Sequence, residues 1–195
     1  KQKVELPGIT LVGSHGAEYM ESGMVEIEPG VDNYREHVSR TIAHLKSKVD
    51  DPLIKWIDKG FGASVHFRNV NNTALVVRRL ETALSESTDV KNLETYWGKM
   101  VLEIVPPGGY DKGFAVRKLQ NKRDLDAIIF LGDDTTDKNA MEALQELKSK
   151  QTISGVAVAV LHSDTSDDLL VHADYTLRGV DGVEQFLTWL VKNVN

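Results

Sequence analysis

Three aspartates follow an apolar run in the stretch Ile128-Ile129-Phe130-Leu131-Gly132-Asp133-Asp134-Thr135-Thr136-Asp137. A helical pattern begins directly afterwards, so the stretch predicts a buried strand, a tight turn and a helix. Ligands of open α/β sheets bind at the carboxyl ends of the strands, where this turn is expected to lie. Crowded carboxylates repel one another unless a cation joins them, and oxygen ligands suit Mg²⁺. Asp133, Asp134 and Asp137 therefore predict a magnesium and phosphate site, although aspartates are also common in turns and helix caps.

A lysine stands in the first turn of the helix that precedes this strand, in Asp111-Lys112-Gly113. Asp111 suits the N-cap position, but the lysine after it faces the partial positive charge of the helix N-terminus. An anion near the turn, such as a phosphate or the cluster of aspartates, would explain Lys112. A solvated surface lysine is the alternative. Since one helix and one strand separate Lys112 from the aspartates, the two motifs can meet at the same edge of the sheet.

A predicted strand over residues 61–68 carries polar side chains on one face. Period-two alternation places Ser64, His66 and Arg68 on that face and apolar residues on the other. A face with a histidine and an arginine could receive a hydroxylated or anionic ligand. An ordinary solvated sheet face is the alternative, and the pattern alone favours it.

Two further pairs could reach the same ligand. Lys99 and Glu103 share one face of a predicted strand over residues 99–106 and could form a charged pair beside the preceding strand. The alternative is a cross-strand ion pair worth under about 1 kcal/mol. His15 and Glu18 follow an early strand and either approach a polar ligand or satisfy local backbone groups.

Composition excludes several classes of protein. The chain has 195 residues, 41% of them apolar, which allows one large or two small domains. A net charge of −6 does not suit a nucleic-acid-binding surface. The sequence contains no cysteine, no signal peptide and no apolar run long enough to span a membrane, so we expect no membrane partner and a cytoplasmic location.

The stretch Pro106-Pro107-Gly108-Gly109 is the clearest boundary in the chain. Before it, the pattern predicts a strand, a hairpin, a helix, a strand, a helix and a strand. After it, the pattern predicts a helix, a strand, a helix, two strands and a helix. The sequence therefore predicts an α+β domain over residues 9–106 and half of an α/β domain over residues 107–195.

Three blocks of the sequence occur together in the order Ser14-His15-Gly16-Ala17-Glu18, Asp111-Lys112-Gly113 and Gly132 to Asp137. With these blocks, the chain resembles trehalose-phosphate phosphatases of the haloacid dehalogenase-like superfamily. The stretches from Gly98 to Glu103 and from Ala173 to Leu177 add to the likeness. The resemblance implies an α/β fold, with a partial Rossmann-like haloacid dehalogenase core and an α+β cap domain. It also implies Mg²⁺-dependent hydrolysis of trehalose 6-phosphate to trehalose and phosphate.

The resemblance also implies roles for particular residues. Asp133 would ligate Mg²⁺, with Asp134 and Asp137 supporting or sharing that role. Lys112 would stabilise the phosphoryl group and the charge of the nucleophile. The cap residues implied for sugar binding are Lys99 and Glu103, with His15, Glu18, His66 and Arg68 as weaker candidates for the same pocket.

Two departures from the family pattern stand out. The family's Asp-x-Asp-Gly-Thr nucleophile block and its Ser/Thr phosphate-binding block do not occur in the sequence. Two βαβ-type stretches of roughly 60–80 residues are therefore expected to be missing. We expect this chain to be a fragment, inactive without that N-terminal core segment, supplied in cis or as a cleaved peptide. Lys138 stands where the family usually has an acidic residue, and its charge could reduce metal affinity.

Two other functions stay open. The chain could belong to a phosphatase of another sugar phosphate, such as sucrose phosphate or a mannosyl phosphate. It could instead be a non-catalytic, phosphatase-like domain that regulates a trehalose-phosphate synthase. Loss of the nucleophile favours that domain, whereas retention of Lys112 and all three aspartates argues against it.

Overall fold

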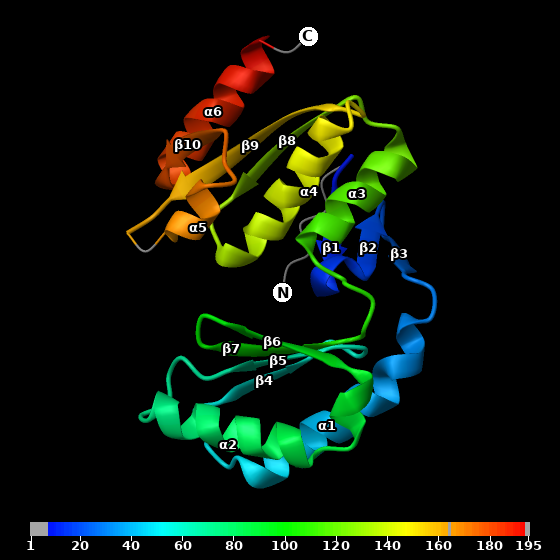
Figure 1. Ribbon diagram of the computed structural model, residues 1–195, viewed down its shortest axis with the longest axis vertical. Helices are drawn as coiled ribbons and strands as arrows, with labels where there is room; N and C mark the ends of the chain where they lie inside the picture. The colour runs from blue at the N-terminus through cyan, green and yellow to red at the C-terminus, as the bar shows by residue number, and fades with distance from the viewer. Residues whose placement is uncertain (1–7, 164, 194–195) are drawn as a thin grey trace. The chain divides into compact units, whose positions relative to one another are not determined.

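A computed structural model of the chain describes residues 8–163 and 165–193. It has the predicted α/β fold class, with helices packed on sheets (Figure 1). The chain divides between Tyr110 and Asp111 into two compact units. Among the described residues, no helix has both the length and the apolar character that crossing a membrane requires.

The first unit begins with a three-stranded antiparallel meander of β1 (Thr10–Gly13), β2 (Glu18–Glu21) and β3 (Met24–Ile27). The short 3₁₀ turn η1 (Ser14–Gly16) joins the first two strands. Ser22 and Gly23 connect β2 to β3 with φ angles of 50° and 80°. Positive φ at both central residues matches the twist of a tight hairpin, so the predicted hairpin is confirmed.

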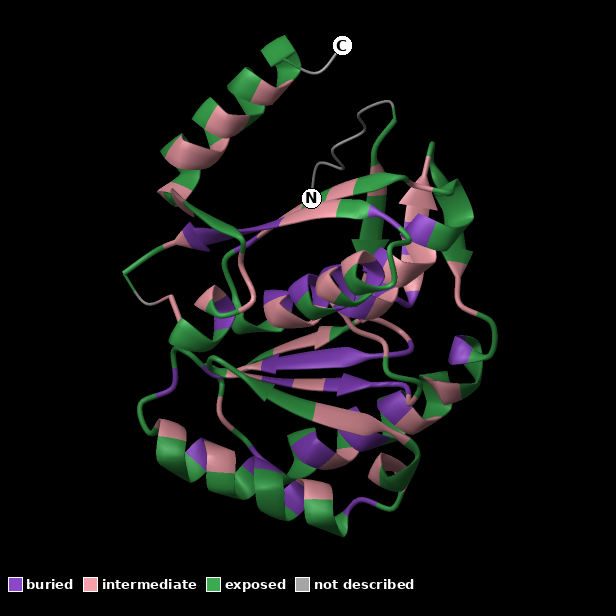
Figure 2. Cartoon of the chain, turned by 45° about the horizontal axis from the view of Figure 1, so that its top comes forward, coloured by how far each residue is buried: buried purple, intermediate pink, exposed green. Residues whose placement is uncertain are grey.

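The larger sheet of this unit is antiparallel, in the order β4-β5-β7-β6. Two helices pack on one of its faces, and in Figure 2 buried residues, coloured purple, recur at intervals along both helices. The core consists of side chains such as Leu45 and Leu80 from the helices and Val65, Leu102 and Ile104 from the strands. The elements are η2 (Val31–Tyr34), α1 (Arg35–Lys48), β4 (Lys55–Asp58), β5 (Ala63–His66), α2 (Thr73–Glu86), η3 (Asp89–Asn92), β6 (Glu94–Gly98) and β7 (Val101–Val105).

Alternation along the two central strands separates the core from a polar face. Val65 and Leu102 lie opposite each other on the helix side, whereas Ser64 and Glu103 lie opposite each other on the other side. The expectation that these strands are neighbours, made from their polar faces, is confirmed. The two edge strands, β4 and β6, were not predicted because each is short and mixes charged residues with aromatic ones.

Two residues lie outside the strands that were predicted to carry them. Lys99 belongs to the two-residue turn between β6 and β7, in which Met100 has a φ of 60°. Since this turn interrupts the strand, the prediction that Lys99 shares a strand face with Glu103 is wrong. Arg68 likewise lies in the exposed turn after β5. Only Ser64 and His66 of the predicted polar face belong to the strand itself.

The second unit is a parallel sheet in the order β10-β9-β8 with helices around it. Its elements are α3 (Lys112–Arg123), β8 (Ala127–Gly132), η4 (Thr135–Asp137), α4 (Lys138–Ser149), β9 (Ser154–Leu161), α5 (Asp167–Leu170), β10 (Tyr175–Arg178) and α6 (Gly179–Asn193). The apolar face of α4 packs on β8 and β9 through Met141 and Leu144, which are fully buried. The continuous apolar run of β9 forms the middle strand of this sheet, and such a run is typical of a parallel strand covered on both faces.

Strand β8 is less buried than predicted. Ile128 and Phe130 face the core cluster under α4, but Ile129, between them, is 42% exposed. Helix α6 packs on β9 and β10, so it covers the sheet away from this strand. An apolar run therefore does not require burial on both faces, because the face of β8 that carries Ile128 and Phe130 packs under α4 and the face that carries Ile129 stays exposed.

Candidate functional site

The aspartate turn at the end of β8 is built around a buried carboxylate. Asp137 is only 4% exposed, and its Oδ2 atom accepts hydrogen bonds of 3.0 Å from the backbone N–H groups of both Asp133 and Asp134. Gly132 is needed here because a Cβ atom at that position would overlap the side chain of Asp137. Asp137 therefore fixes the shape of the turn in which the other two aspartates lie.

Lys112 meets this turn, as its position in the sequence predicted. Its Nζ atom lies 2.5 Å from Oδ1 of Asp137, although 25 residues separate the two in the chain. The side chain of Lys112 remains 44% exposed. Asp111 holds the start of α3 by accepting the N–H of Phe114 at 2.6 Å, as an N-cap does. A side chain from the helix start therefore presents its positive charge beside the turn.

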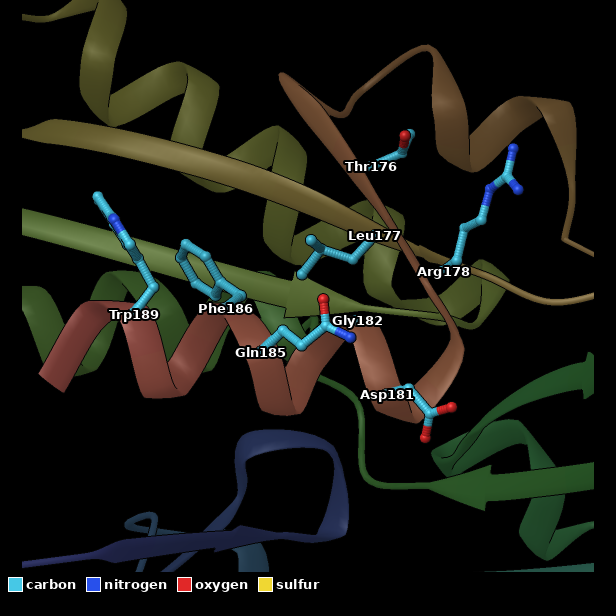
Figure 3. Close-up of a pocket in the computed structure, with 8 residues that line it drawn as sticks. All are labelled: Thr176, Leu177, Arg178, Asp181, Gly182, Gln185, Phe186 and Trp189. Carbon is cyan, nitrogen blue, oxygen red and sulfur yellow. The ribbon is translucent and has the colours of Figure 1, made fainter. Parts of the chain in front are cut away.

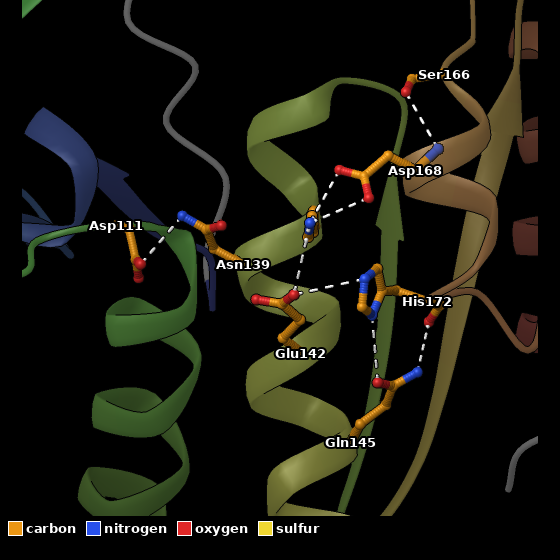
Figure 4. A network of polar contacts seen from close by, with 8 residues as sticks. Asp111, Asn139, Glu142, Gln145, Ser166, Asp168 and His172 are labelled. Carbon is orange, nitrogen blue, oxygen red and sulfur yellow. Dashed lines mark hydrogen bonds and ion pairs between the residues drawn. The ribbon is translucent and has the colours of Figure 1, made fainter. Parts of the chain in front are cut away.

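Close packing of α3 on α4 sets this geometry. Gly113 faces the backbone oxygen of Asn139, and a Cβ atom would collide with it. The amide of Asn139 also donates to Oδ2 of Asp111 at 3.1 Å (Figure 4). Gly113 thus permits the close approach of α3 and α4. In the Asp-Lys-Gly motif, Asp111 caps the helix, Lys112 contacts Asp137 and Gly113 allows the packing that brings them together.

The other two aspartates differ in what their side chains do. Asp134 caps the following turn by accepting the N–H and hydroxyl of Thr135, at 2.7 and 3.0 Å. Asp133 has a side chain that is 61% exposed, and its Oδ2 atom lies 3.5 Å from Nε2 of His162. His162, which was not predicted, follows the neighbouring strand β9. Its position directly after a second parallel strand could have indicated that His162 lies at the same edge of the sheet as the aspartates.

The fit of these residues to Mg²⁺ is partial. Within residues 8–163 and 165–193, no group of three or more histidine or acidic side chains is arranged to hold a metal ion. Asp133 nevertheless offers a carboxylate at the carboxyl end of a parallel strand, and Mg²⁺ often uses one or two carboxylates with water and a substrate phosphate. Asp133 is the best placed of the three, because the carboxylates of Asp134 and Asp137 already accept hydrogen bonds within the turn.

Lys138 directs its charge away from the aspartate turn. Its Nζ atom lies 2.9 Å from Oδ2 of Asp168 in α5 and 3.9 Å from Glu142. The hydrogen bond to Asp168, together with the charges of Asp168 and Glu142, raises the pKa of Lys138. The residue is therefore firmly protonated, but its charge is balanced by acidic side chains outside the turn.

A second polar group surrounds Glu103 in the first unit. Its Oε2 atom accepts from Oγ of Ser64 at 2.7 Å and Nζ of Lys59 at 3.0 Å, and Nε2 of His15 lies at 3.4 Å. Burial alone would raise the pKa of Glu103. The hydrogen bonds from His15, Ser64 and Lys59, with the charge of Lys59, outweigh burial and lower the pKa to about 2. The carboxylate is therefore ionised at neutral pH.

The predicted sugar-binding residues are only partly brought together. His15 and Glu103 are in contact, whereas Glu18 lies beside Ser14, whose hydroxyl is 3.5 Å from Glu18 Oε2. His66 is half-buried near the end of β5, where it lies opposite Val101. The lysine that pairs with Glu103 is Lys59, which the sequence pattern did not indicate, rather than Lys99. Lys59 escaped notice because the strand before it is a short edge strand.

A separate hollow lies between β10 and α6. It has a volume of about 630 Å³ and is lined by apolar side chains such as Leu177, Phe186 and Trp189, with Arg178 and Asp181 at one end (Figure 3). Phe186 and Trp189 stack with ring centroids 6.1 Å apart. None of the predicted site residues lines this hollow, so it is distinct from the two polar groups.

The chain was compared with known proteins. The trehalose-phosphatase family model matches residues 1–180. The chain is 29% identical to probable trehalose-phosphate phosphatase C of Arabidopsis thaliana, over 97% of this chain and 60% of that protein. It is 28% identical to the trehalose-phosphate phosphatase of Mycobacterium ulcerans, over 85% of this chain and 42% of that protein. The chain therefore spans about two fifths to three fifths of the length of these curated relatives.

A solved structure has the same fold. The crystal structure of a trehalose-6-phosphate phosphatase related protein matches with a TM-score of 0.72 and 23% identity, over 96% of this chain and 75% of that one. The likeness in structure covers both the antiparallel and the parallel sheets. With a family model that matches most of its length and relatives that match nearly all of it, the chain belongs to the trehalose-phosphatase family.

Proposed function

We propose that this chain is part of a phosphatase that hydrolyses trehalose 6-phosphate to trehalose and phosphate. The observation that carries the proposal is the ammonium group of Lys112, which is held 2.5 Å from Asp137 in the turn that also carries Asp133. A positive charge and an exposed carboxylate at the carboxyl end of a parallel sheet suit a phosphoryl group and its cation. The names of the matched relatives support the choice of reaction.

Each residue of the turn has a distinct part in this proposal. Lys112 stabilises the negative charge of the transferring phosphoryl group, and Asp137 holds its ammonium group in place. Asp133, supported by Asp134, would hold Mg²⁺, which when bound neutralises phosphate charge. Asp137 contributes to the metal site mainly by fixing the backbone that carries Asp133. Of the two roles that the resemblance implied for Asp134 and Asp137, supporting or sharing the metal, the proposal assigns them the supporting one.

The proposal assigns sugar recognition to the region of residues 9–106, as a cap domain. Glu103, with a pKa of about 2, is an ionised acceptor for sugar hydroxyl groups, and Lys59 beside it can donate. Lys99, in the turn between β6 and β7, remains a proposed sugar-binding residue. So do Glu18, His66 and Arg68, which are supported by the sequence resemblance and by their positions in polar segments of the sequence.

The phosphoryl acceptor lies outside these residues in our proposal. No Asp-x-Asp-Gly-Thr block occurs within the 195 residues, and no other residue is assigned the role of nucleophile. We propose that a further core segment supplies it, in cis or as a cleaved peptide. An intact-mass measurement of the purified native protein tests this part. A single species of 21.7 kDa, with no accompanying peptide, would contradict it.

Phosphate release tests the function itself. We expect the native protein to release phosphate from trehalose 6-phosphate only when Mg²⁺ is present, and faster than from sucrose 6-phosphate or a mannosyl phosphate. Lys112→Met should abolish release from every substrate. Glu103→Gln should weaken the use of the true disaccharide phosphate alone. Release from none of these substrates, by protein that is folded and complete by mass, would leave the regulatory domain as the better explanation.

A further inference from the structure

The segment that carries His15 has an uncommon backbone. Three consecutive residues have positive φ angles, 49° at Ser14, 58° at His15 and 98° at Gly16. Glycine adopts this region freely, but serine and histidine do so at a cost in free energy. Such conformations persist where the surrounding structure fixes them, and they are enriched at functional sites. Contacts with the surrounding structure must therefore hold this turn in place.

A small apolar cluster, separate from the main core, holds the turn. Ala17, Val31 and Phe61 are each no more than 2% exposed and pack together. Ala17 follows the left-handed turn directly, and its N–H donates to the carbonyl of Ser14 at 3.2 Å. The guanidinium of Arg35 lies 5.3 Å from the ring centroid of Phe61. The cluster therefore ties the segment after His15 to the region around Phe61.

The same cluster fixes a second donor to Glu103. Phe61 lies in the turn between β4 and β5, and Lys59 closes this turn by donating its N–H to the carbonyl of Gly62 at 2.8 Å. Lys59 and His15 are thus anchored on either side of one apolar contact, through Phe61 and Ala17. Both side chains then extend to the same carboxylate.

The donors crowd one oxygen of that carboxylate. Ser64, Lys59 and His15 all approach Oε2 of Glu103, at 2.7, 3.0 and 3.4 Å. Among residues 8–163 and 165–193, no hydrogen bond or ion pair is recorded for the other oxygen, Oε1. Donors that converge on one oxygen restrict rotation of the carboxylate, and an ionised oxygen without a partner is a strong acceptor.

We infer that His15 is a positioning residue that acts through Glu103. By donating from Nε2 to Oε2, it holds the carboxylate so that Oε1 is presented to a hydroxyl group of a sugar ligand. His15 itself need not touch the sugar. The nature of the ligand rests on the proposed function, whereas the effect of His15 on Glu103 does not.

Three variants of His15 distinguish loss of the hydrogen-bond donor from a change in the backbone conformation. Gln places its amide nitrogen the same number of bonds from Cβ as Nε2 of histidine, so His15→Gln keeps a donor of similar reach. Asn tolerates positive φ well but is one bond shorter, so His15→Asn keeps the backbone and loses the contact. His15→Ala removes the donor altogether. Amide NMR spectra show whether each variant keeps the fold of the native chain.

A pH titration of the Glu103 side-chain carboxyl, monitored by carbon NMR, tests the contact between His15 and Glu103 without any ligand. We expect His15→Asn and His15→Ala to raise the pKa of Glu103 by about 0.5–1 unit, as the loss of one hydrogen bond would. His15→Gln should stay near the wild-type value. A pKa that is the same in wild type and His15→Asn would overturn the inference.

Calorimetric titration with trehalose 6-phosphate reads out the consequence. We expect His15→Asn to weaken binding between about twofold and tenfold, and His15→Gln to bind nearly as wild type does. A raised pKa with unchanged affinity would overturn the presentation of Oε1 to the sugar. If the wild-type protein does not bind this ligand, the proposed substrate fails, while the carboxyl titration still decides whether His15 positions Glu103.

Discussion

The ammonium group of Lys112 and the buried carboxylate of Asp137 form an ion pair of 2.5 Å across the start of two helices. The other oxygen of the same carboxylate accepts two backbone N–H groups of the aspartate turn. One side chain thus joins the proposed catalytic lysine to the loop that carries Asp133. One oxygen of Asp137 holds the proposed catalytic lysine and the other stabilises the turn. Loss of this side chain should therefore affect both the stability of the unit and its proposed chemistry.

Replacement of Asp137 by alanine should destabilise the second unit strongly. The change removes the buried carboxylate that accepts two N–H groups of the turn and that pairs with Lys112, so we expect a loss of about 2–4 kcal/mol in the free energy of unfolding. Urea denaturation measures it. Asp133→Ala is the matched control, since that side chain is 61% exposed, and it should cost under about 0.5 kcal/mol. Equal losses in the two variants would contradict this account.

Magnesium affinity should depend on Asp133 and not on Lys138. We expect Asp133→Asn to weaken Mg²⁺ binding by about tenfold or more, since loss of even an indirect partner of a metal can cost that much. Lys138→Ala should change it by less than about twofold, because the charge of Lys138 is paired with Asp168. Amide NMR shifts during a Mg²⁺ titration give both affinities. A large gain in affinity for Lys138→Ala would show that its charge does oppose the metal.

Stability should fall in acid through Glu103. Its pKa is lowered to about 2 in the folded chain, below the ordinary value of 4.5. Such a group stabilises the fold above pH 4.5, and this contribution is lost as the pH falls from about 4.5 to 2. We expect the wild-type chain to lose about 1–3 kcal/mol more than Glu103→Gln over this range. Urea denaturation at several pH values compares the two.

Comparison of wild type with Glu103→Gln also controls for other carboxyl groups that titrate in this pH range. Asp89 and Asp174 also have lowered pKa values, the first through His37 and Arg40 and the second through the N–H of Ala157 and Lys148. Their contributions are present in both variants and therefore cancel. Parallel pH profiles for wild type and Glu103→Gln would mean that Glu103 is not the group responsible.

Two glycines of the second unit should differ in their tolerance of alanine. At Gly132 a Cβ atom would overlap the side chain of Asp137, which the turn holds rigidly. At Gly155 it would meet Cδ1 of Leu144 at 2.6 Å, at the far end of a longer side chain. We expect Gly132→Ala to cost about 2–3 kcal/mol in the free energy of unfolding and Gly155→Ala clearly less. The reverse order in a denaturation experiment would refute the assigned role of Gly132.

Local sequence patterns predicted the elements whose signal lies within the element itself. The hairpin that follows the first strand and the N-cap at Asp111 are examples. Edge strands β4 and β6 were missed because they form through pairing with distant partners, which no local pattern records. Predictions based on alternation also failed where a turn interrupted the strand, as at Lys99.

The candidate site was predictable in its residue types and less so in its contacts. Lys112 and the aspartate turn do meet, as two motifs at one sheet edge should. The burial of Asp137 could not be predicted from the sequence, because nothing in the sequence distinguishes it from the two other aspartates of the same turn. The contact of Lys59 with Glu103 could not be predicted either. Lys59 lies in the turn before β5, and the register of β5 with β7, which sets Ser64 opposite Glu103, is fixed only in the folded sheet.

The order of the parallel sheet also bears on how the chain folds. Strands β8, β9 and β10 follow one another in sequence, and each pairs with its immediate successor. Their connections are short, through α4 and then α5, so the loop-closure entropy of each pairing is small. Residues 127–178 can therefore assemble a sheet early, without contacts from distant parts of the chain. In a hydrogen-exchange experiment, the amides of the central strand β9 should then be the slowest of this unit to exchange.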